Sequence, residues 1–157
     1  MLCRTHNAAA VEYPTHPVKF VVPYTPGGTT DVLARVIAQW LSEKMGQQFV
    51  IENKPGGGNN IGVEYVVNSA PDGYTMLLVN PANGINATLY KNLSFNFIRD
   101  IAPVAGITSE SRVMMVTPSG PANTGHEFIV YAQANHAHTS MAAGGYGTST
   151  NMSAGRF

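Results

Sequence analysis

Two short segments combine glycine with threonine in a way that suits the binding of an anion. The first, PYTPGGTTD, spans residues 23–31, and the second, GGYGTST, spans residues 144–150. Each leads into a predicted helix, whose N-terminus offers free N–H groups and a partial positive charge. Glycine lets the backbone approach a ligand, and threonine hydroxyls add donors. Neither loop contains Lys or Arg. The pattern therefore favours a carboxylate over a polyphosphate.

The same composition also has a purely structural interpretation, because glycine and threonine commonly form tight turns and helix caps. Other chemistries have less support. The segment PGGGNNIG at residues 55–62 lacks the GxGxxG spacing of dinucleotide-binding loops, and neither GxxxxGK[ST] nor GxSxG occurs. His136 and His138 have no adjacent Cys or acidic residue, so no metal site is expected there. We expect no cofactor, no metal and no catalytic residue, while binding and turn formation both remain open for the two loops.

A strand and a helix are predicted on either side of the first loop. Residues 18–23 form a short apolar run bounded by prolines, which is typical of a strand. Thr29 or Thr30 is the expected N-terminal cap of the helix, and Gly46 is the expected C-terminal stop. Apolar residues recur at intervals of three and four, which predicts one apolar helix face made of Val32, Leu33, Val36, Ile37, Trp40, Leu41 and Met45.

The next segments extend this pattern to β-α-β-α-β. Residues 49–51 and 75–79 are predicted strands, and IGVEYVVNSA between them is a predicted helix. This order predicts a parallel α/β sheet with right-handed crossovers, and ligands of such sheets bind beyond the carboxyl ends of the strands. The loop NPANG, residues 80–84, would leave that same edge. Additional strands are expected at residues 101–107, 112–118 and 139–143, and a further helix at residues 126–135.

Composition excludes several classes of protein. The chain has 157 residues, of which 44% are hydrophobic and 11% charged, and nine basic residues balance nine acidic ones. No net positive field exists to attract nucleic acid, and no apolar run is long enough to span a bilayer. Cys3 is the only cysteine, so no internal disulfide can form. These features predict a globular protein whose partners include no nucleic acid.

The chain as a whole resembles one known family, and the resemblance depends on many weak motifs in register. The chain resembles the Bug family, which comprises the TctC-like extracytoplasmic receptors of tripartite tricarboxylate transporters. The segments that resemble the family are YPTHPVKFVVPYTPGGTTDVLAR, GQQFVIENKPGGGNNIGVEYV, APDGYTMLL, LYKNLSFNFIRDIAPVAGI, VMMVTPS, EFIVYAQAN and GYGTSTNMSAGRF. The resemblance covers about residues 13–157 in collinear order. The chain departs from the family pattern at Asn96-Phe97, His136-Ala137-His138, Asn151 and Arg156.

The resemblance implies an α/β fold like that of type II periplasmic binding proteins, with two lobes that close around a small organic carboxylate without catalysis. It implies a ligand-binding loop in the first lobe formed by Tyr24, Pro26, Gly27, Gly28 and Thr29, with Asp31 supporting the start of the helix. Asn80 and Asn83 would line the same lobe. Gly147, Thr148 and Ser149 would form the counterpart in the second lobe.

The resemblance also implies a domain organisation and partners. Residues 1–12 are expected to be a signal remnant or a disordered tail, because MLCRTHN lacks the apolar core of a secretory signal. Residues 13–117 would form the first lobe, and residues 118–157 the start of an incomplete second lobe. We expect a periplasmic location, membrane components of a transporter as partners, and a possible homodimer through the incomplete lobe. The alternatives are an α/β enzyme or nucleotide-binding domain that uses the same loops, or a truncated remnant without function.

Overall fold

A computed structural model describes residues 12–109, 111, 113–140 and 148–154. The chain divides into two compact units, Met1–Val79 and Asn80–Phe157. The boundary between lobes that the resemblance implies, at residues 117 and 118, remains a prediction.

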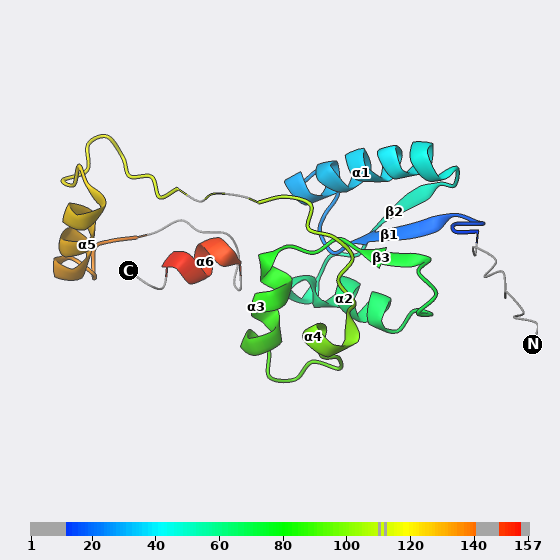
Figure 1. The fold of residues 1–157 in the computed structure, drawn as a ribbon. Helices are drawn as coiled ribbons and strands as arrows, with labels where there is room; N and C mark the ends of the chain where they lie inside the picture. The colour runs from blue at the N-terminus through cyan, green and yellow to red at the C-terminus, as the bar shows by residue number, and fades with distance from the viewer. Residues whose placement is uncertain (1–11, 110, 112, 141–147, 155–157) are drawn as a thin grey trace, which may run out of the picture. The chain divides into compact units, whose positions relative to one another are not determined.

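The first unit is a three-stranded parallel sheet with helices on both faces (Figure 1). Its strands β1 (Val18–Val22), β2 (Phe49–Asn53) and β3 (Thr75–Leu77) lie in the order β2-β1-β3. One face carries α1 (Thr29–Met45), and the other carries α2 (Asn60–Val67), which follows the short 3-10 helix η1 (Gly57–Asn59). The predicted parallel α/β sheet is confirmed.

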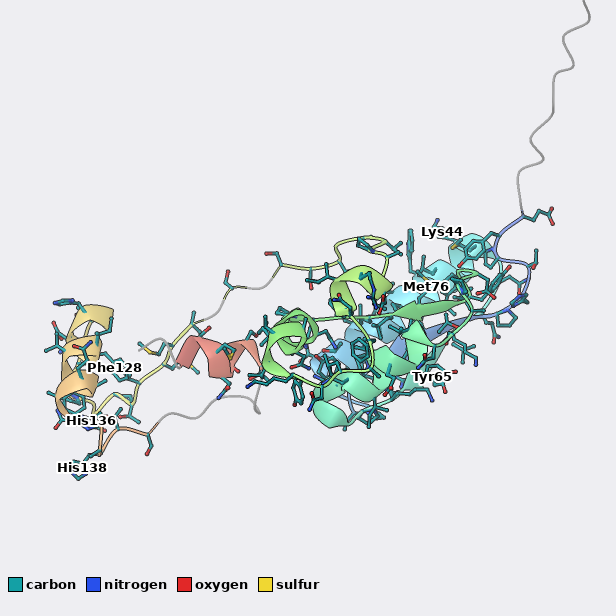
Figure 2. All side chains as sticks on the ribbon, turned by 90° about the horizontal axis from the view of Figure 1, so that it is seen from below. Lys44, Tyr65, Met76, Phe128, His136 and His138 are labelled. Carbon is teal, nitrogen blue, oxygen red and sulfur yellow. The ribbon has the colours of Figure 1, made fainter. Side chains whose placement is uncertain are left out.

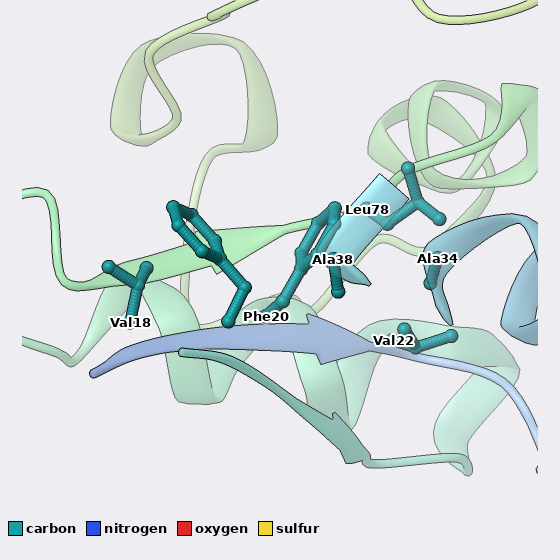
Figure 3. Close-up of a cluster of buried hydrophobic side chains, with 7 residues drawn as sticks. Val18, Phe20, Val22, Ala34, Ala38 and Leu78 are labelled. Atoms are coloured by element: carbon teal, nitrogen blue, oxygen red, sulfur yellow. The ribbon is translucent and has the colours of Figure 1, made fainter. Parts of the chain in front are cut away.

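The core of the first unit lies between the sheet and α1. Val18, Phe20 and Val22 alternate along β1 and point toward α1, where Ala34 and Ala38 meet them (Figure 3). All five side chains are almost fully buried, and Phe49 and Leu78 complete the cluster. The alanines let the helix approach the strands closely, which fixes the height of α1 above the sheet.

The predicted apolar face of α1 is only partly correct. Ile37 and Leu41 pack against the core, whereas Val32, Val36 and Trp40 are 53%, 62% and 57% exposed. The helix is rotated because Asp31, at its start, is buried together with Ala34 and Ala38. The N-terminal cap is also different, since Gly28 occupies that position in place of Thr29 or Thr30. Gly46 is the C-cap in a left-handed conformation, as predicted.

The regular secondary structure in the described residues of the second unit is helical. It contains α3 (Pro81–Leu89), α4 (Phe97–Asp100), α5 (Gly125–Ala134) and α6 (Ser149–Ala154). The helix predicted at residues 126–135 is confirmed by α5. NPANG is not a loop, because Asn80 caps α3 and Pro81 opens it.

The strands predicted at residues 101–107 and 112–118 are absent from the described part of the chain. Their apolar character suits a strand, yet a strand requires a neighbour for its backbone N–H and C=O groups. No second strand of the described residues lies beside them, and Val113 and Met115 are 80% and 86% exposed. Residues 139 and 140 are not in a strand, and the rest of the candidate at 139–143 lies outside the described residues.

The two units are expected to differ in local stability. Amide hydrogen exchange monitored by NMR should be slowest in β1 and β3, because their N–H groups are paired in the sheet over a buried core. Amides of residues 113–118 should exchange rapidly, since that segment is exposed and has no ladder partner in the described residues. Equal protection of both segments would contradict this expectation.

Candidate functional site

The loop after β1 presents an exposed backbone at the carboxyl edge of the sheet. Val21 and Val22 at the end of β1 accept hydrogen bonds from Leu78 N and Lys54 N, so the chain leaves all three strands at one edge. Pro23 is fully buried beneath the loop, whereas residues 25–29 are exposed. This segment is therefore accessible to a ligand and anchored at its base.

Free N–H donors gather at the start of α1. Gly28 is the N-cap residue and provides no side-chain cap, while its carbonyl accepts from Val32 N at 2.9 Å. Among the described residues, none accepts a hydrogen bond from the backbone N–H of Thr29, Thr30 or Asp31. These groups carry the positive end of the helix dipole. An acceptor placed there would satisfy several donors at once.

Gly27 and Gly28 have different roles in the loop. Gly27 has φ = 83°, in the left-handed region that favours glycine, and its conformation turns the chain into the helix. Gly28 has φ = −76° and ψ = 166°, which any residue can adopt. A Cβ atom added at Gly28 would have Thr25 O as its nearest neighbour, at 3.7 Å, an ordinary contact. Gly27 is thus required for the turn, and Gly28 keeps the space over the free N–H groups open.

Asp31 faces the protein interior. Its side chain is buried, and Oδ2 accepts from Gly27 N and Arg35 Nε, both at 2.9 Å. Oδ1 accepts from Asn53 Nδ2 at 2.8 Å and from Arg35 Nη2 at 3.1 Å. These hydrogen bonds, first that of Arg35 and then that of Gly27, hold the pKa of the Asp31 carboxyl well below its ordinary value. The carboxylate therefore stays ionised near neutral pH and supports the loop from behind.

Tyr24 and Pro26 form the remaining part of the predicted loop. Tyr24 is half-buried and packs against the core of the first unit, and its carbonyl accepts from Asn53 Nδ2 at 3.1 Å. Pro26 is exposed at the tip. The structure therefore brings Tyr24, Gly27, Gly28, Thr29 and Asp31 together in one turn.

The start of α3 contains a buried amide. Asn80 Oδ1 accepts from Ala82 N at 2.9 Å, and Asn80 N donates to Asn83 Oδ1 at 3.1 Å, which forms a capping box. The Asn80 N–H fixes which end of the Asn83 amide is the oxygen. Asn83 is 2% exposed, and its Nδ2 has no hydrogen-bond partner among the described residues. The first turn of α3 thus holds a buried neutral donor in addition to its backbone N–H groups.

The predicted counterpart in the second unit is described only in part. Gly147 lies outside the described residues. Thr148 precedes α6, and its Oγ1 accepts from Asn151 N at 3.3 Å, which is a capping interaction. Ser149 is the first residue of α6.

Arg35 and Asn53 belong to the loop's surroundings and were missed by the sequence analysis. Arg35 lies one helical turn after Asp31, a spacing that indicates an ion pair. Asn53 ends β2 at the carboxyl edge of the sheet, where polar side chains often serve a site. Both signals are visible in the sequence only once the loop itself is regarded as a site.

Metal ligands do not gather in the described residues, where no group of three or more His, Cys, Asp or Glu side chains could hold an ion. His136 and His138 lie just beyond α5 (Figure 2). No helix within the described ranges is both long and apolar enough to cross a membrane.

Comparisons of this chain with family models, curated proteins and solved structures all identify the same family. Residues 33–157 match the model of the tripartite tricarboxylate transporter family receptor. The chain is 37% identical to a UPF0065 protein of Bordetella pertussis over 153 residues, which are 97% of this chain and 47% of that protein. The chain thus spans about half the length of the curated relatives that it matches.

Two solved structures of this kind share the fold. The R. palustris protein Rpa4515 with adipate is 41% identical and has a TM-score of 0.65, over 78% of this chain and 42% of that one. MatC from Rhodopseudomonas palustris with bound malate is 27% identical and has a TM-score of 0.68, over 90% of this chain and 49% of that one. These likenesses confirm the predicted fold class, a parallel sheet flanked by helices as in periplasmic binding proteins.

Proposed function

This chain belongs to the tripartite tricarboxylate transporter receptor family, and we propose that it is a solute-binding receptor that captures a small organic carboxylate without converting it. The family is one of transport receptors, which supports binding in place of catalysis. Adipate and malate, which accompany two of the solved relatives, are both dicarboxylates.

The observation that carries this proposal is the exposed start of α1. Its first-turn N–H groups have no acceptor among the described residues, and no Lys or Arg lies within residues 23–31. A carboxylate is small enough to accept from adjacent N–H groups of one helix turn, and its single charge matches the dipole. A loop without a basic side chain would offer little to the several charges of a polyphosphate. Ligand contacts by Tyr24, Pro26, Gly27, Gly28 and Thr29 follow from this proposal.

The other predicted contacts remain part of the proposal. The Asn83 Nδ2 group, which has no partner among the described residues, supports a polar ligand contact at α3, next to Asn80. Gly147, Thr148 and Ser149 are proposed as further contacts of the same chemical type. A periplasmic location and delivery to transporter membrane components are proposed from family membership. A homodimer through the second lobe, residues 118–157, is a further part of the proposal.

A thermal-shift screen separates this function from the nucleotide-binding alternative. The chain should be stabilised by adipate or malate and not by NAD or ATP, because its loops lack the phosphate-binding motifs. A ligand at about 100 times its Kd would add about 2.7 kcal/mol to the free energy of unfolding. Stabilisation by a nucleotide alone would contradict the receptor function.

A further inference from the structure

One amide side chain connects the candidate loop to both α1 and the sheet. Asn53 is the last residue of β2, and the strand register places it beside Val22 at the end of β1. Its Nδ2 donates to Tyr24 O at 3.1 Å and to Asp31 Oδ1 at 2.8 Å. Its Oδ1 accepts from Arg35 Nη2 at 3.3 Å. Asn53 therefore contacts Tyr24, the residue just before the exposed turn, and the carboxylate that holds Gly27.

These bonds hold the turn in place from behind. Gly27 N donates to Asp31 Oδ2 at 2.9 Å, and the exposed residues 25–29 make few apolar contacts of their own. Without such anchors the turn would lose conformational entropy each time a ligand ordered it, and affinity would fall accordingly. Asn53 and Asp31 together hold the turn at two points, the Tyr24 carbonyl before it and the Gly27 N–H at its middle.

The network also neutralises a charge that would oppose an anion. Asp31 is buried directly behind the free N–H groups of α1, where its negative charge would repel a carboxylate ligand. Arg35 forms a two-pronged ion pair with it, and the Asn53 amide donates a further hydrogen bond. The negative charge is thereby compensated while the Gly27 N–H stays bound.

We propose that Asn53 is a positioning residue, which acts through Asp31 and the Tyr24 carbonyl to keep the β1–α1 loop in its ligand-ready conformation. This inference rests on the proposed function of the loop. Asn53 itself is turned toward Asp31, Arg35 and the base of the turn, so it supports the ligand contacts without making one.

Asn53→Asp is the strongest test, because an ionised carboxylate cannot donate the hydrogen bonds that the amide donates to Tyr24 O and Asp31 Oδ1. An ionised carboxylate at position 53 would face the Asp31 carboxylate, with Arg35 as the cation that contacts both positions. Glu52 and Lys54 pair with each other, and Lys54 Nζ lies over the Tyr65 ring of α2 on the opposite face of the sheet. Like charges in contact raise the pKa of one carboxyl. The introduced carboxyl can donate to Asp31 when it is protonated, whereas it repels Asp31 when it is ionised.

Affinity for adipate should therefore become pH-dependent in the variant. Asn53→Asp should bind adipate at least roughly tenfold more weakly than the parent at about pH 8 and recover much of this loss at about pH 5. Asn53→Ala should bind adipate weakly at both pH values. Each variant is compared with the parent at the same pH, which removes the titration of adipate itself, and Asp31 stays ionised throughout because its pKa is far below this range. Asn68→Asp adds the same charge at the exposed end of α2 and is the matched control.

Hydrogen exchange of the Gly27 amide in the absence of ligand separates this inference from the proposed function. Gly27 exchange faster than in the parent at the same pH, in Asn53→Ala at both pH values and in Asn53→Asp only at the higher one, would support a positioning role even if the parent bound neither adipate nor malate. The proposed function would fail in that case. Unchanged Gly27 exchange together with an affinity equal to that of Asn68→Asp at both pH values would overturn the role of Asn53.

Discussion

Gly28→Val is expected to abolish the binding of adipate while the first unit stays folded. The side chain of an N-cap residue lies over the N–H groups of the first helical turn. Glycine leaves these groups open, and the branched valine side chain would cover them with methyl groups. Loss of two hydrogen bonds to a charged acceptor, at about 1.5–3 kcal/mol each, corresponds to a loss of affinity of more than about a hundredfold.

The geometry of Gly28 makes this variant informative. Its φ of −76° suits any residue, and a Cβ atom would lie 3.7 Å from its nearest neighbour, Thr25 O. The substitution therefore adds bulk without straining the backbone. Gly106→Val is the matched control, because a Cβ atom there has no neighbour within 4 Å and residue 106 lies far along the chain from the loop. Circular dichroism would establish that both variants are folded, and calorimetry would give their affinities.

Gly28→Ser distinguishes a binding loop from a simple turn. Serine is a better N-cap residue than glycine, by a few tenths of a kcal/mol, because its hydroxyl accepts from a first-turn N–H. The variant should be at least as stable as the parent and yet bind adipate more weakly, since its hydroxyl competes with the ligand for the same donors. If Gly28→Ser and Gly28→Val both retained the affinity of the parent, the loop would be only a turn.

Sequence patterns predicted the first unit well because its signals are local. Proline at each end of an apolar run defined β1, and the glycines of the following turn placed the start of a helix. The rotation of α1 could not be predicted in the same way, since Ala34 and Ala38 carry little hydrophobic signal and yet form its buried face. Their role depends on how closely the helix approaches the sheet, which is a property of packing.

Features that depend on distant residues were harder to predict. Residues 101–107 have the composition of a strand, but a strand needs a partner that local composition cannot reveal. The same reason applies to the candidate site. Asn53 reaches Asp31 only because β2 pairs with β1 in the register that sets Val22 beside Asn53. The loop was visible from its own residues, whereas the side chains that hold it come from other elements.

Gly62→Ala is expected to destabilise the first unit strongly, for a reason that motif spacing did not reveal. Gly62 lies in the first turn of α2, where the helix crosses the ends of β1 and β2. An added Cβ atom would lie 2.7 Å from Pro23 Cβ, 2.9 Å from Lys54 O and 3.0 Å from Pro23 Cα. Most of these atoms belong to the backbone and cannot rotate away. Overpacking of this kind costs about 1–3 kcal/mol, which outweighs the better helix propensity of alanine.

Gly84→Ala provides the matched comparison, because it makes the same change inside another helix. Gly84 lies in α3, and a Cβ atom there would have no neighbour within 4 Å. Alanine should therefore stabilise that helix by up to about 1 kcal/mol, through propensity alone. Thermal unfolding followed by circular dichroism should show shifts of opposite sign for the two variants. Gly62→Ala should also weaken the binding of adipate, since Pro23 is the base of the β1–α1 loop and must move to admit the methyl group. A Gly62→Ala variant as stable as the parent would contradict the close packing of α2 against Pro23.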